Sequence, residues 1–220
     1  MLLLLDTISV YPKFVLINNN NSVKSIHILD KNNTKISDII LLKYLEFEKK
    51  NNFNQKLTSL FVLTGPGSYT GLRVGIAFMY GLSLSKNIPI YGIPCTDLFI
   101  KQIKKNFFIK NLIFIFSGNN QNFICIPKSK QKYKIFKISK ELISTKIKFS
   151  DYNHFYCNSS FPASLKNLKI SRKNIKIFDI IKLFNEELID RSKKEKIINP
   201  IYISDNKILN YKIDKNIQIK

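Results

Sequence analysis

The stretch TGPGSYTGLRVGIAFMYGLSLSKNIPIYG, from Thr64 to Gly92, holds six of the seven glycines in a chain of 220 residues. Its loop, Gly65 to Ser68, lies between an apolar run at Thr58 to Leu63 that predicts a strand and a segment at Tyr69 to Ser85 that predicts a helix. Ser68 is a candidate N-cap for this helix. Because a glycine-rich turn at a helix N-terminus presents free backbone N–H groups, the loop is also a physically sound anion site.

The loop departs from a Walker A phosphate-binding loop at its last glycine. Gly71 is followed by Leu72 and Arg73, where that motif requires Lys and then Ser or Thr. Gly71 and Gly75 inside the helix each cost roughly 0.5–1 kcal/mol relative to Ala, so another group is expected to approach closely there. Two interpretations stay open: the helix packs on its own sheet, or a partner helix packs on it.

Both long helices predicted in the first half are apolar on more than one side. The segment from Tyr69 to Ser85 carries apolar residues in every direction, and the segment from Asp38 to Lys49, with Ser37 as candidate N-cap, carries more than one apolar stripe. Two such helices cannot easily both be interior in a small chain, so we expect one face on the sheet and one on another subunit. The predicted interface residues are Ile39, Leu42, Leu45, Gly71, Leu72, Gly75, Phe78 and Met79.

The elements around this block predict an α/β fold. Strands are expected at Leu2 to Leu5, Lys13 to Ile17 and Val23 to Leu29 before the first helix, and at Ile88 to Tyr91 after the second. The resulting order, βββαβαβ, is that of a ribonuclease H-like unit.

The same order of elements begins again in the second half. Strands are expected at Leu112 to Phe116, Asn122 to Ile126, Tyr133 to Ile138 and His154 to Cys157, with a helix at Asp179 to Ile189. Two such units in tandem predict an actin-like architecture. We place the boundary in the lysine-rich segment near Lys101 to Lys110, which gives domains 1–104 and 105–220.

Composition favours a cytoplasmic protein with no membrane partner. The net charge is +21, but only three of the 36 basic residues are Arg and the lysines are dispersed, which favours compositional bias over a nucleic-acid groove. Cys95, Cys125 and Cys157 form no C-x-x-C pair, which argues against a disulfide framework or a zinc site. The opening MLLLL is too short for a signal segment.

Three motifs along the chain resemble, in order, those of the bacterial TsaB (YeaZ) family. They are Asp6-Thr7, GPGSYTGLRVG at Gly65 to Gly75, and Pro200-Ile201-Tyr202. The resemblance implies an actin-like (ASKHA) fold of two ribonuclease H-like lobes. It implies a non-catalytic dimerisation subunit of the complex that installs threonylcarbamoyl on the adenosine next to the tRNA anticodon.

The resemblance also implies the partners. The first two long helices would bind and activate a TsaD-like catalytic subunit or a second copy of the chain, a TsaE-like ATPase would join them, and tRNA would be contacted only through the complex. No cofactor is expected to bind tightly, and any ATP or ADP is expected at the subunit junction. TsaD-like proteins carry an H-x-x-x-H metal motif, whereas this chain has only His27 and His154, so we expect no metal and no catalytic residue.

The second half departs from the family. Ser117-Gly118-Asn119 stands where acids and an Arg are usual, Cys157-Asn158-Ser159 replaces a Gly-x-Gly turn, and Ser204 replaces an Arg. These losses put cleft chemistry in the second lobe in doubt.

A competing hypothesis is a small actin-like ATPase or phosphotransferase. Its nucleotide-adjacent candidates are Asp6, Thr7, Gly65, Gly67 and Ser68. For Asp6 and Ser68 we favour capping of nearby backbone N–H groups over phosphate or metal binding. A third, weaker hypothesis is a basic tRNA-binding module.

Overall fold

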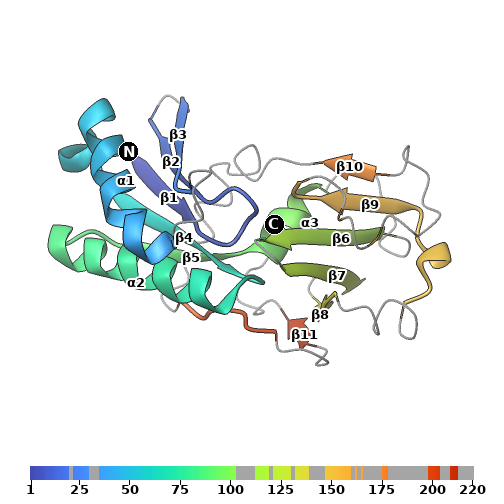
Figure 1. Cartoon of the computed structure of the whole chain (residues 1–220). Helices are drawn as coiled ribbons and strands as arrows, with labels where there is room; N and C mark the ends of the chain where they lie inside the picture. The colour runs from blue at the N-terminus through green and yellow to red at the C-terminus, as the bar shows by residue number, and fades with distance from the viewer. Residues whose placement is uncertain are drawn as a thin grey trace. The chain divides into compact units, whose positions relative to one another are not determined.

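The computed structural model describes residues 1–19, 22–29, 35–102, 112–118, 121–129, 132–138, 147–159, 162, 165, 175–177, 198–203 and 209–212. The chain divides into two compact units (Figure 1). The first is Met1–Pro94 with Ser192–Ile201, and the second is Cys95–Arg191 with Tyr202–Lys220. The predicted boundary between residues 104 and 105 lies outside the described residues. Within the described ranges, no helix combines the length and apolar character that spanning a membrane requires.

The first unit is built on a five-stranded sheet. Its strands are β1 (Leu2–Asp6), β2 (Lys13–Ile17), β3 (Val23–His27), β4 (Ser59–Gly65) and β5 (Ile90–Pro94), in the spatial order β3-β2-β1-β4-β5. β2 is antiparallel to β1 and β3, whereas β4 is parallel to β1 and β5. The predicted order βββαβαβ is confirmed, with β5 beginning two residues later than predicted.

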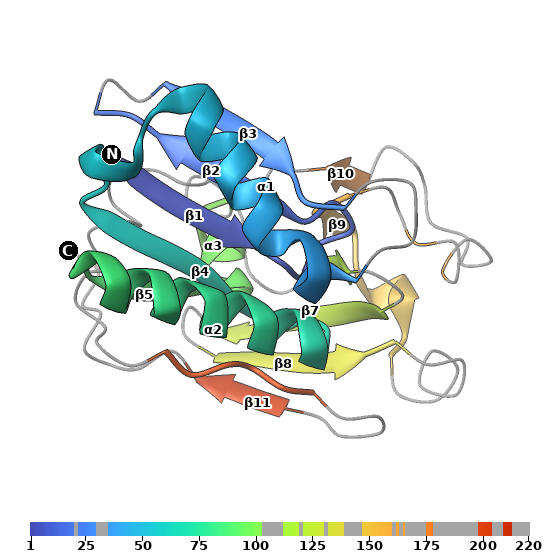
Figure 2. The same cartoon turned by 60° about the vertical axis from the view of Figure 1, so that its left-hand side comes forward.

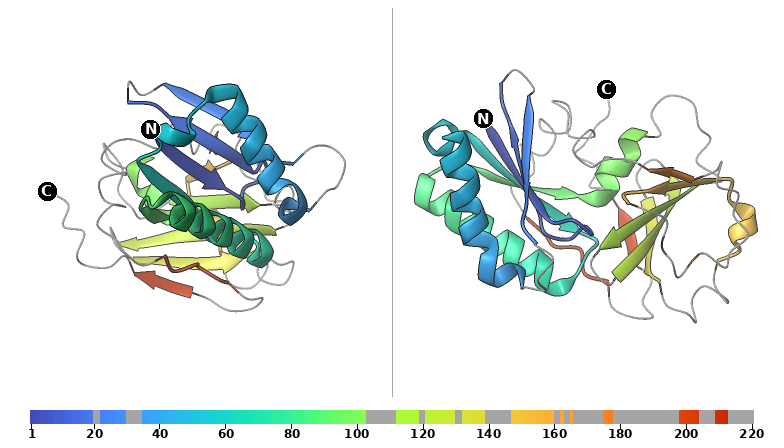
Figure 3. Two further views of the ribbon diagram at one scale, coloured as in Figure 1. Left: turned by 90° about the vertical axis from the view of Figure 1, so that its left-hand side faces the viewer. Right: turned by 45° about the horizontal axis from the view of Figure 1, so that its top comes forward.

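Two helices, α1 (Ile36–Asn51) and α2 (Tyr69–Lys86), cover the same face of this sheet, as Figures 2 and 3 show from different sides. A short 3-10 turn (Asn54–Lys56) follows α1. Beneath the helices, Tyr44 of α1 packs edge to face on Phe14 and Phe53 and touches Phe78 of α2, with ring centroids 5.7–5.9 Å apart. Aromatic packing therefore fixes both helices on the sheet.

The helix starts confirm one predicted cap and correct another. Ser68 is the N-cap of α2, because its hydroxyl oxygen accepts a hydrogen bond from the Gly71 N–H at 3.0 Å. Ser37 is not the N-cap of α1: Lys35 occupies that position without a side-chain bond. Ser37 already lies inside the first turn, where its hydroxyl donates to the Asp38 carboxylate at 2.7 Å.

The second unit contains a six-stranded sheet. Its elements are α3 (Cys95–Gln102), β6 (Leu112–Gly118), β7 (Gln121–Ser129), β8 (Lys132–Lys137), a 3-10 turn (Phe149–Asp151), β9 (His154–Cys157), β10 (Ile175–Ile177) and β11 (Leu209–Lys212). The spatial order is β10-β9-β6-β7-β8-β11. The predicted helix at Asp179 to Ile189 lies outside the described residues.

The two sheets share one topology. β6 pairs antiparallel with β7 and parallel with β9, as β1 does with β2 and β4. The outer pairings, β7 with β8 and β9 with β10, repeat those of β2 with β3 and β4 with β5. The predicted repetition of the unit is thus confirmed in strand pairing, and β11 adds an antiparallel edge strand beside β8.

Candidate functional site

The carboxylate at the end of β1 caps the turn that follows it. Asp6 is fully buried, and its Oδ1 accepts hydrogen bonds from the backbone N–H groups of Ile8 at 3.1 Å and Ser9 at 3.0 Å. Its Oδ2 accepts a hydrogen bond from the Ser9 hydroxyl. Burial raises the pKa of Asp6 above 3.8, while these hydrogen bonds and Lys13 act in the opposite direction. The carboxylate oxygens are therefore engaged within the turn.

Thr7 joins the end of β1 to α2. Its hydroxyl donates to the carbonyl oxygen of Gly71 at 2.7 Å, and the space beside Gly75 is filled by the Thr7 side chain. A Cβ on Gly71 would lie 2.6 Å from the Thr7 carbonyl oxygen. Of the two interpretations of the helical glycines, the structure shows packing of α2 on its own unit.

The glycines of the loop, like those of α2, allow other residues of the same chain to pack closely against them. Gly65 has a φ of +115°, and a Cβ there would lie 2.8 Å from the carbonyl oxygen of Ile201. The N–H of Ile201 donates to the Thr64 carbonyl oxygen at 2.7 Å. The Pro200-Ile201-Tyr202 motif thus includes the point where a late segment closes on β4, and Gly67 faces the side chain of Ile8.

The structure brings together the residues named for a nucleotide site, Asp6, Thr7, Gly65, Gly67 and Ser68, but they do not fit a phosphate group. Both oxygens of Asp6 and the hydroxyls of Thr7 and Ser68 already form hydrogen bonds inside the unit. Ile201 fills the space beside Gly65, and Ile8 fills the space beside Gly67. Among the residues that the structure describes, no three His, Cys, Asp or Glu side chains gather as metal ligands.

The predicted interface residues fall into two groups. Leu42 and Leu45 on α1 are 63% and 51% exposed, and Ile39 and Phe78 are partly buried against the core. Gly71, Leu72, Gly75 and Met79 are buried. Their placement on a surface was wrong, because these four positions lie on the side of α2 that faces its own sheet.

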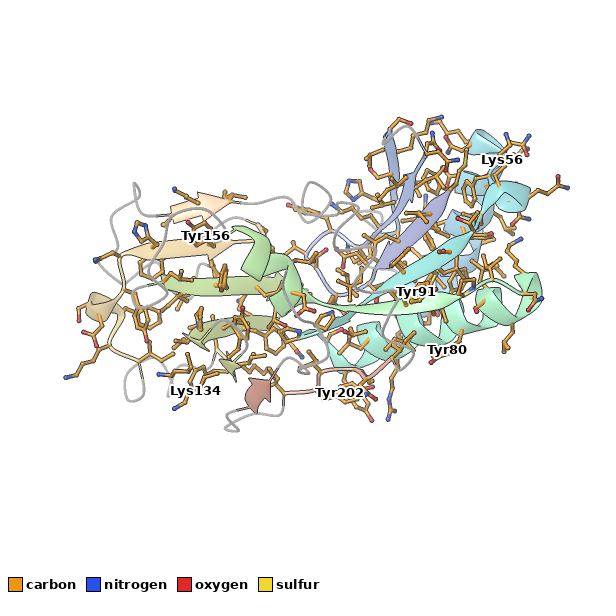
Figure 4. The ribbon with its side chains drawn as sticks, turned by 180° about the vertical axis from the view of Figure 1, so that it is seen from behind. Lys56, Tyr80, Tyr91, Lys134, Tyr156 and Tyr202 are labelled. Carbon is orange, nitrogen blue, oxygen red and sulfur yellow. The ribbon has the colours of Figure 1, made fainter. Side chains whose placement is uncertain are left out.

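The exposed side of α2 contains residues that the sequence analysis did not predict as part of an interface. Tyr69, Arg73, Tyr80 and Leu84 are exposed, and Leu84 reaches 82% exposure. Figure 4 labels Tyr80 on this helix. The Arg73 guanidinium lies 3.9 Å from the centre of the Tyr69 ring, an arrangement that holds both side chains on the surface. The intervals of four, seven and four residues between these positions place them on one side of a helix and could have marked this stripe in the sequence.

Gly81 and Leu41 also belong to the exposed side of the two helices. A Cβ on Gly81 would meet no atom within 4 Å, in contrast to Gly71 and Gly75. Leu41 on α1, 56% exposed, adds a further apolar side chain. The outer face of α1 and α2 is defined here as Leu41, Leu42, Leu45, Tyr69, Arg73, Tyr80, Gly81 and Leu84.

In the second unit, polar groups gather where β6 and β9 end. The amide of Asn158 binds the backbone of Ser117: its Oδ1 accepts from the Ser117 N–H at 2.7 Å, and its Nδ2 donates to the Ser117 carbonyl at 2.9 Å. The buried Ser117 hydroxyl has no hydrogen-bond partner among the residues that the structure describes. His27 on β3 and His154 on β9 belong to different units.

Two ribonuclease H-like units in tandem define a protein of the actin-like fold class. The family model for TsaD, described as tRNA N6-adenosine threonylcarbamoyltransferase, matches residues 45–152. An uncharacterized protein with similarity to peptidase YeaZ, from Pseudomonas aeruginosa, has a similar structure with a TM-score of 0.59. YeaZ from Pseudomonas aeruginosa gives a TM-score of 0.58.

Each of these structures is 11% identical in sequence, and the similarity covers 92% of this chain and 99% of the other. No curated protein gives a significant match. The fold of the chain is therefore similar to that of YeaZ from Pseudomonas aeruginosa, and the predicted two-lobed fold is confirmed.

Proposed function

We propose that this protein is a non-catalytic subunit of the complex that installs threonylcarbamoyl on the adenosine next to the tRNA anticodon. In this proposal it binds and activates a TsaD-like catalytic subunit, and a TsaE-like ATPase joins the complex. The match of residues 45–152 to the TsaD family model and the YeaZ-like fold support this role.

The observation that carries the proposal is the outer face of α1 and α2. Leu42, Leu45 and Leu84 are more than half exposed on helices whose other faces are packed on the sheet. Large apolar side chains that stay exposed on both helices are typical of a protein interface. We therefore assign the outer face to the TsaD-like partner.

The competing ATPase hypothesis receives less support. It needs a free Asp6 carboxylate beside the metal-bound phosphates and open space at the glycine-rich loop. Ser9 binds this carboxylate, and Ile8 and Ile201 fill the space beside Gly67 and Gly65. It predicts ATP turnover by the purified chain alone, and we expect none. ATP or ADP at a subunit junction stays a prediction.

The test of the proposed interface is a titration of the purified chain with the separately purified TsaD-like protein of the same organism. The variant carries Leu42→Glu and Leu45→Glu, which place two carboxylates in the expected contact. Losing the burial of two leucines should weaken binding by about 3 kcal/mol, or roughly a hundredfold, as measured by isothermal titration calorimetry.

The matched control is Lys24→Glu, which reverses an exposed charge on β3, outside the outer face. It should bind the TsaD-like protein as the wild type does. Thermal midpoints of both variants should stay close to the wild type, because all three side chains are exposed. Unchanged binding by the double variant would refute this interface, and no binding by the wild type would refute the proposed role.

A further inference from the structure

β3 (Val23–His27) forms one edge of the first sheet, and no strand of the described residues lies beyond it (Figures 2 and 3). Four of its five side chains are exposed. The outer edge of such a strand carries N–H and C=O groups that can bind another extended chain. β3 is therefore a candidate site for the addition of a strand, and none of its residues belongs to the outer face of α1 and α2.

Hydrogen bonds at both ends of β3 fix its phase against β2. The Ile28 N–H donates to the Pro12 carbonyl oxygen at 2.8 Å, and the Asn18 N–H donates to the Ser22 carbonyl oxygen at 3.0 Å. Both pairs continue the antiparallel register of β2 and β3. In an antiparallel ladder, hydrogen-bonded pairs alternate with pairs that are not hydrogen-bonded.

This alternation determines which backbone groups of β3 face the open edge. Lys24 and Ile26 lie at positions whose N–H and C=O groups bond to β2. The backbone groups of Val23, Ser25 and His27 point the other way, toward the edge. β3 thus presents three residues with outward N–H and C=O groups, which is the pattern that a further strand requires.

The two faces of β3 carry different side chains. Ile26 packs against the core beneath the helices, and Lys24, two residues away, lies exposed on the same face. On the opposite face, Val23 is 46% exposed. The ring of Tyr11, which is 65% exposed, packs edge to face on His27 with ring centroids 6.2 Å apart. One face of the edge is therefore basic, and the other is apolar and aromatic.

We propose that β3 binds an extended segment of an acidic partner protein as a further strand of the first sheet. The acidic side chains of this segment lie beside Lys24, and its apolar side chains lie beside Val23 and Tyr11. Side chains of neighbouring strands alternate between the same two faces. The partner residues that bond to Val23, Ser25 and His27 are therefore the apolar ones, and the acids lie between them.

Charge indicates which kind of strand binds. The chain has a net charge of +21, and β3 carries one Lys and neither Asp nor Glu. An acidic segment is attracted to such a surface, whereas a second copy of the chain is repelled. Lysine on an edge strand also opposes the pairing of two identical edges. The inference does not rest on the proposed function, because it concerns a different surface.

The experiment is a titration of the full-length, isotope-labelled chain with a peptide of alternating Val and Glu, blocked at both ends and followed by NMR. The amide signals of Val23, Ser25 and His27 should shift, and these N–H groups should exchange more slowly with solvent. A peptide with Lys in place of every Glu should bind about tenfold more weakly, because it brings like charges to Lys24.

Two N-methylated peptides separate backbone pairing from charge attraction. Methyl groups on the Val nitrogens lie in the contact with β3 and should abolish binding. Methyl groups on the Glu nitrogens point away from β3 and should leave the affinity within about twofold of the unmodified peptide. Equal binding by the two peptides would overturn the pairing of strands.

Variants of the protein test the same contact. Ser25→Pro removes the N–H at the centre of the open edge and leaves the ladder with β2 intact, so peptide binding should weaken by about tenfold or more. Ser25→Ala keeps this N–H and is the matched control. Lys24→Glu should weaken binding roughly fivefold. Circular dichroism of each variant should match the wild type.

The inference would be overturned by a wild type whose β3 signals do not move at up to about 2 mM peptide, a concentration that detects even weak binding. A Ser25→Pro chain that is folded and binds as well as Ser25→Ala would overturn it too. Calorimetry with the TsaD-like subunit is a separate measurement, and its result bears only on the proposed function.

Discussion

The ends of β1 and β6 occupy the same place in two copies of one topology, yet they are held in different ways. At the end of β1, Asp6 caps its own turn through Ile8 and Ser9. At the end of β6, Asn158 reaches over from the end of β9 and binds the backbone of Ser117. One strand end is thus fixed by a local cap and the other by a clamp between neighbouring strands.

The surroundings of the two ends differ as well. The end of β1 is packed by Thr7 against the bare positions of α2, and its polar side chains are satisfied. At the end of β6, the buried Ser117 hydroxyl has no hydrogen-bond partner in the described part of the chain. The comparison teaches that the first unit keeps a tightly specified strand end, whereas the second keeps its topology with a less complete set of hydrogen bonds.

The largest effect should come from filling the space between β1 and α2. Gly75→Leu would force a side chain into Thr7, and we expect a loss of about 3 kcal/mol or more in the free energy of unfolding. Gly81→Ala on the same helix is the matched control, because nothing lies near it. It should gain roughly 0.5–1 kcal/mol from helix propensity. Urea unfolding measures both, and a neutral Gly75→Leu would contradict the packing argument.

Removing the local cap should have the next largest effect. Asp6→Ala leaves the backbone N–H groups of Ile8 and Ser9 without their acceptor, while the Ser9 hydroxyl keeps the Tyr11 carbonyl oxygen at 3.3 Å. We expect a net loss of about 2–3 kcal/mol. Because the substitution also removes the desolvation cost of a buried carboxyl group, the loss is smaller than the sum of three hydrogen bonds. The same urea assay applies, and a stability equal to the wild type would show that the turn holds without its cap.

Breaking the clamp in the second unit should be slightly less damaging. Asn158→Ala removes two hydrogen bonds to the Ser117 backbone, and we expect a loss of about 2 kcal/mol. Hydrogen exchange should locate the change at the ends of β6 and β9. Uniformly faster exchange over both units would contradict a local clamp.

A substitution of Ser117 should raise the stability of the protein, whereas the substitutions of Asp6 and Asn158 should lower it. Ser117→Ala removes a buried hydroxyl that has no partner, so the protein should gain roughly 1 kcal/mol in stability. Its thermal midpoint, followed by circular dichroism, should rise. A lower midpoint would mean that the hydroxyl is stabilising and that the two strand ends are more alike than the structure indicates.

The smallest effect concerns pH. Because burial raises the pKa of Asp6 above 3.8, the folded state binds this proton more tightly than the unfolded chain. The contribution of this proton to the free energy of unfolding is fully present below pH 3.8. It is lost as the pH rises through the pKa of Asp6 in the folded state. Asp6→Asn cannot ionise, so it should lose less stability than the wild type between about pH 4 and pH 7 in urea unfolding. Equal losses would place the pKa of Asp6 at its usual value.

Much of the fold follows from local patterns. The apolar runs at Leu2 to Leu5 and Thr58 to Leu63 predict β1 and β4, because strands covered on both faces need continuous apolar sequence. Ser68 is recognisable as a cap because its hydroxyl acts on a group three residues away. The prediction of Ser37 as the N-cap of α1 was wrong, because residue type alone does not determine at which residue a helix begins.

The candidate site was less predictable. Of the predicted interface residues, Leu42 and Leu45 are exposed and Gly71 and Gly75 are buried. A bare helical stripe in a sequence does not reveal which group approaches it. Thr7 is more than 60 residues away in sequence, and only folding brings it onto α2. The clamp between Asn158 and Ser117 is equally invisible in the sequence, since a strand pairing sets its geometry.

By itself the sequence determined the order of strands and helices, the repetition of the unit, the cap of α2 and the motifs that resemble the TsaB family, because these depend on residues close together in the chain. The tertiary structure decided which sides of α1 and α2 stay exposed and which glycines meet Thr7, Ile8 and Ile201. It also decided that the hydroxyls of Thr7 and Ser68 are bound within the unit. Those outcomes depend on which distant segments pack together, and local periodicity carries no information about that choice.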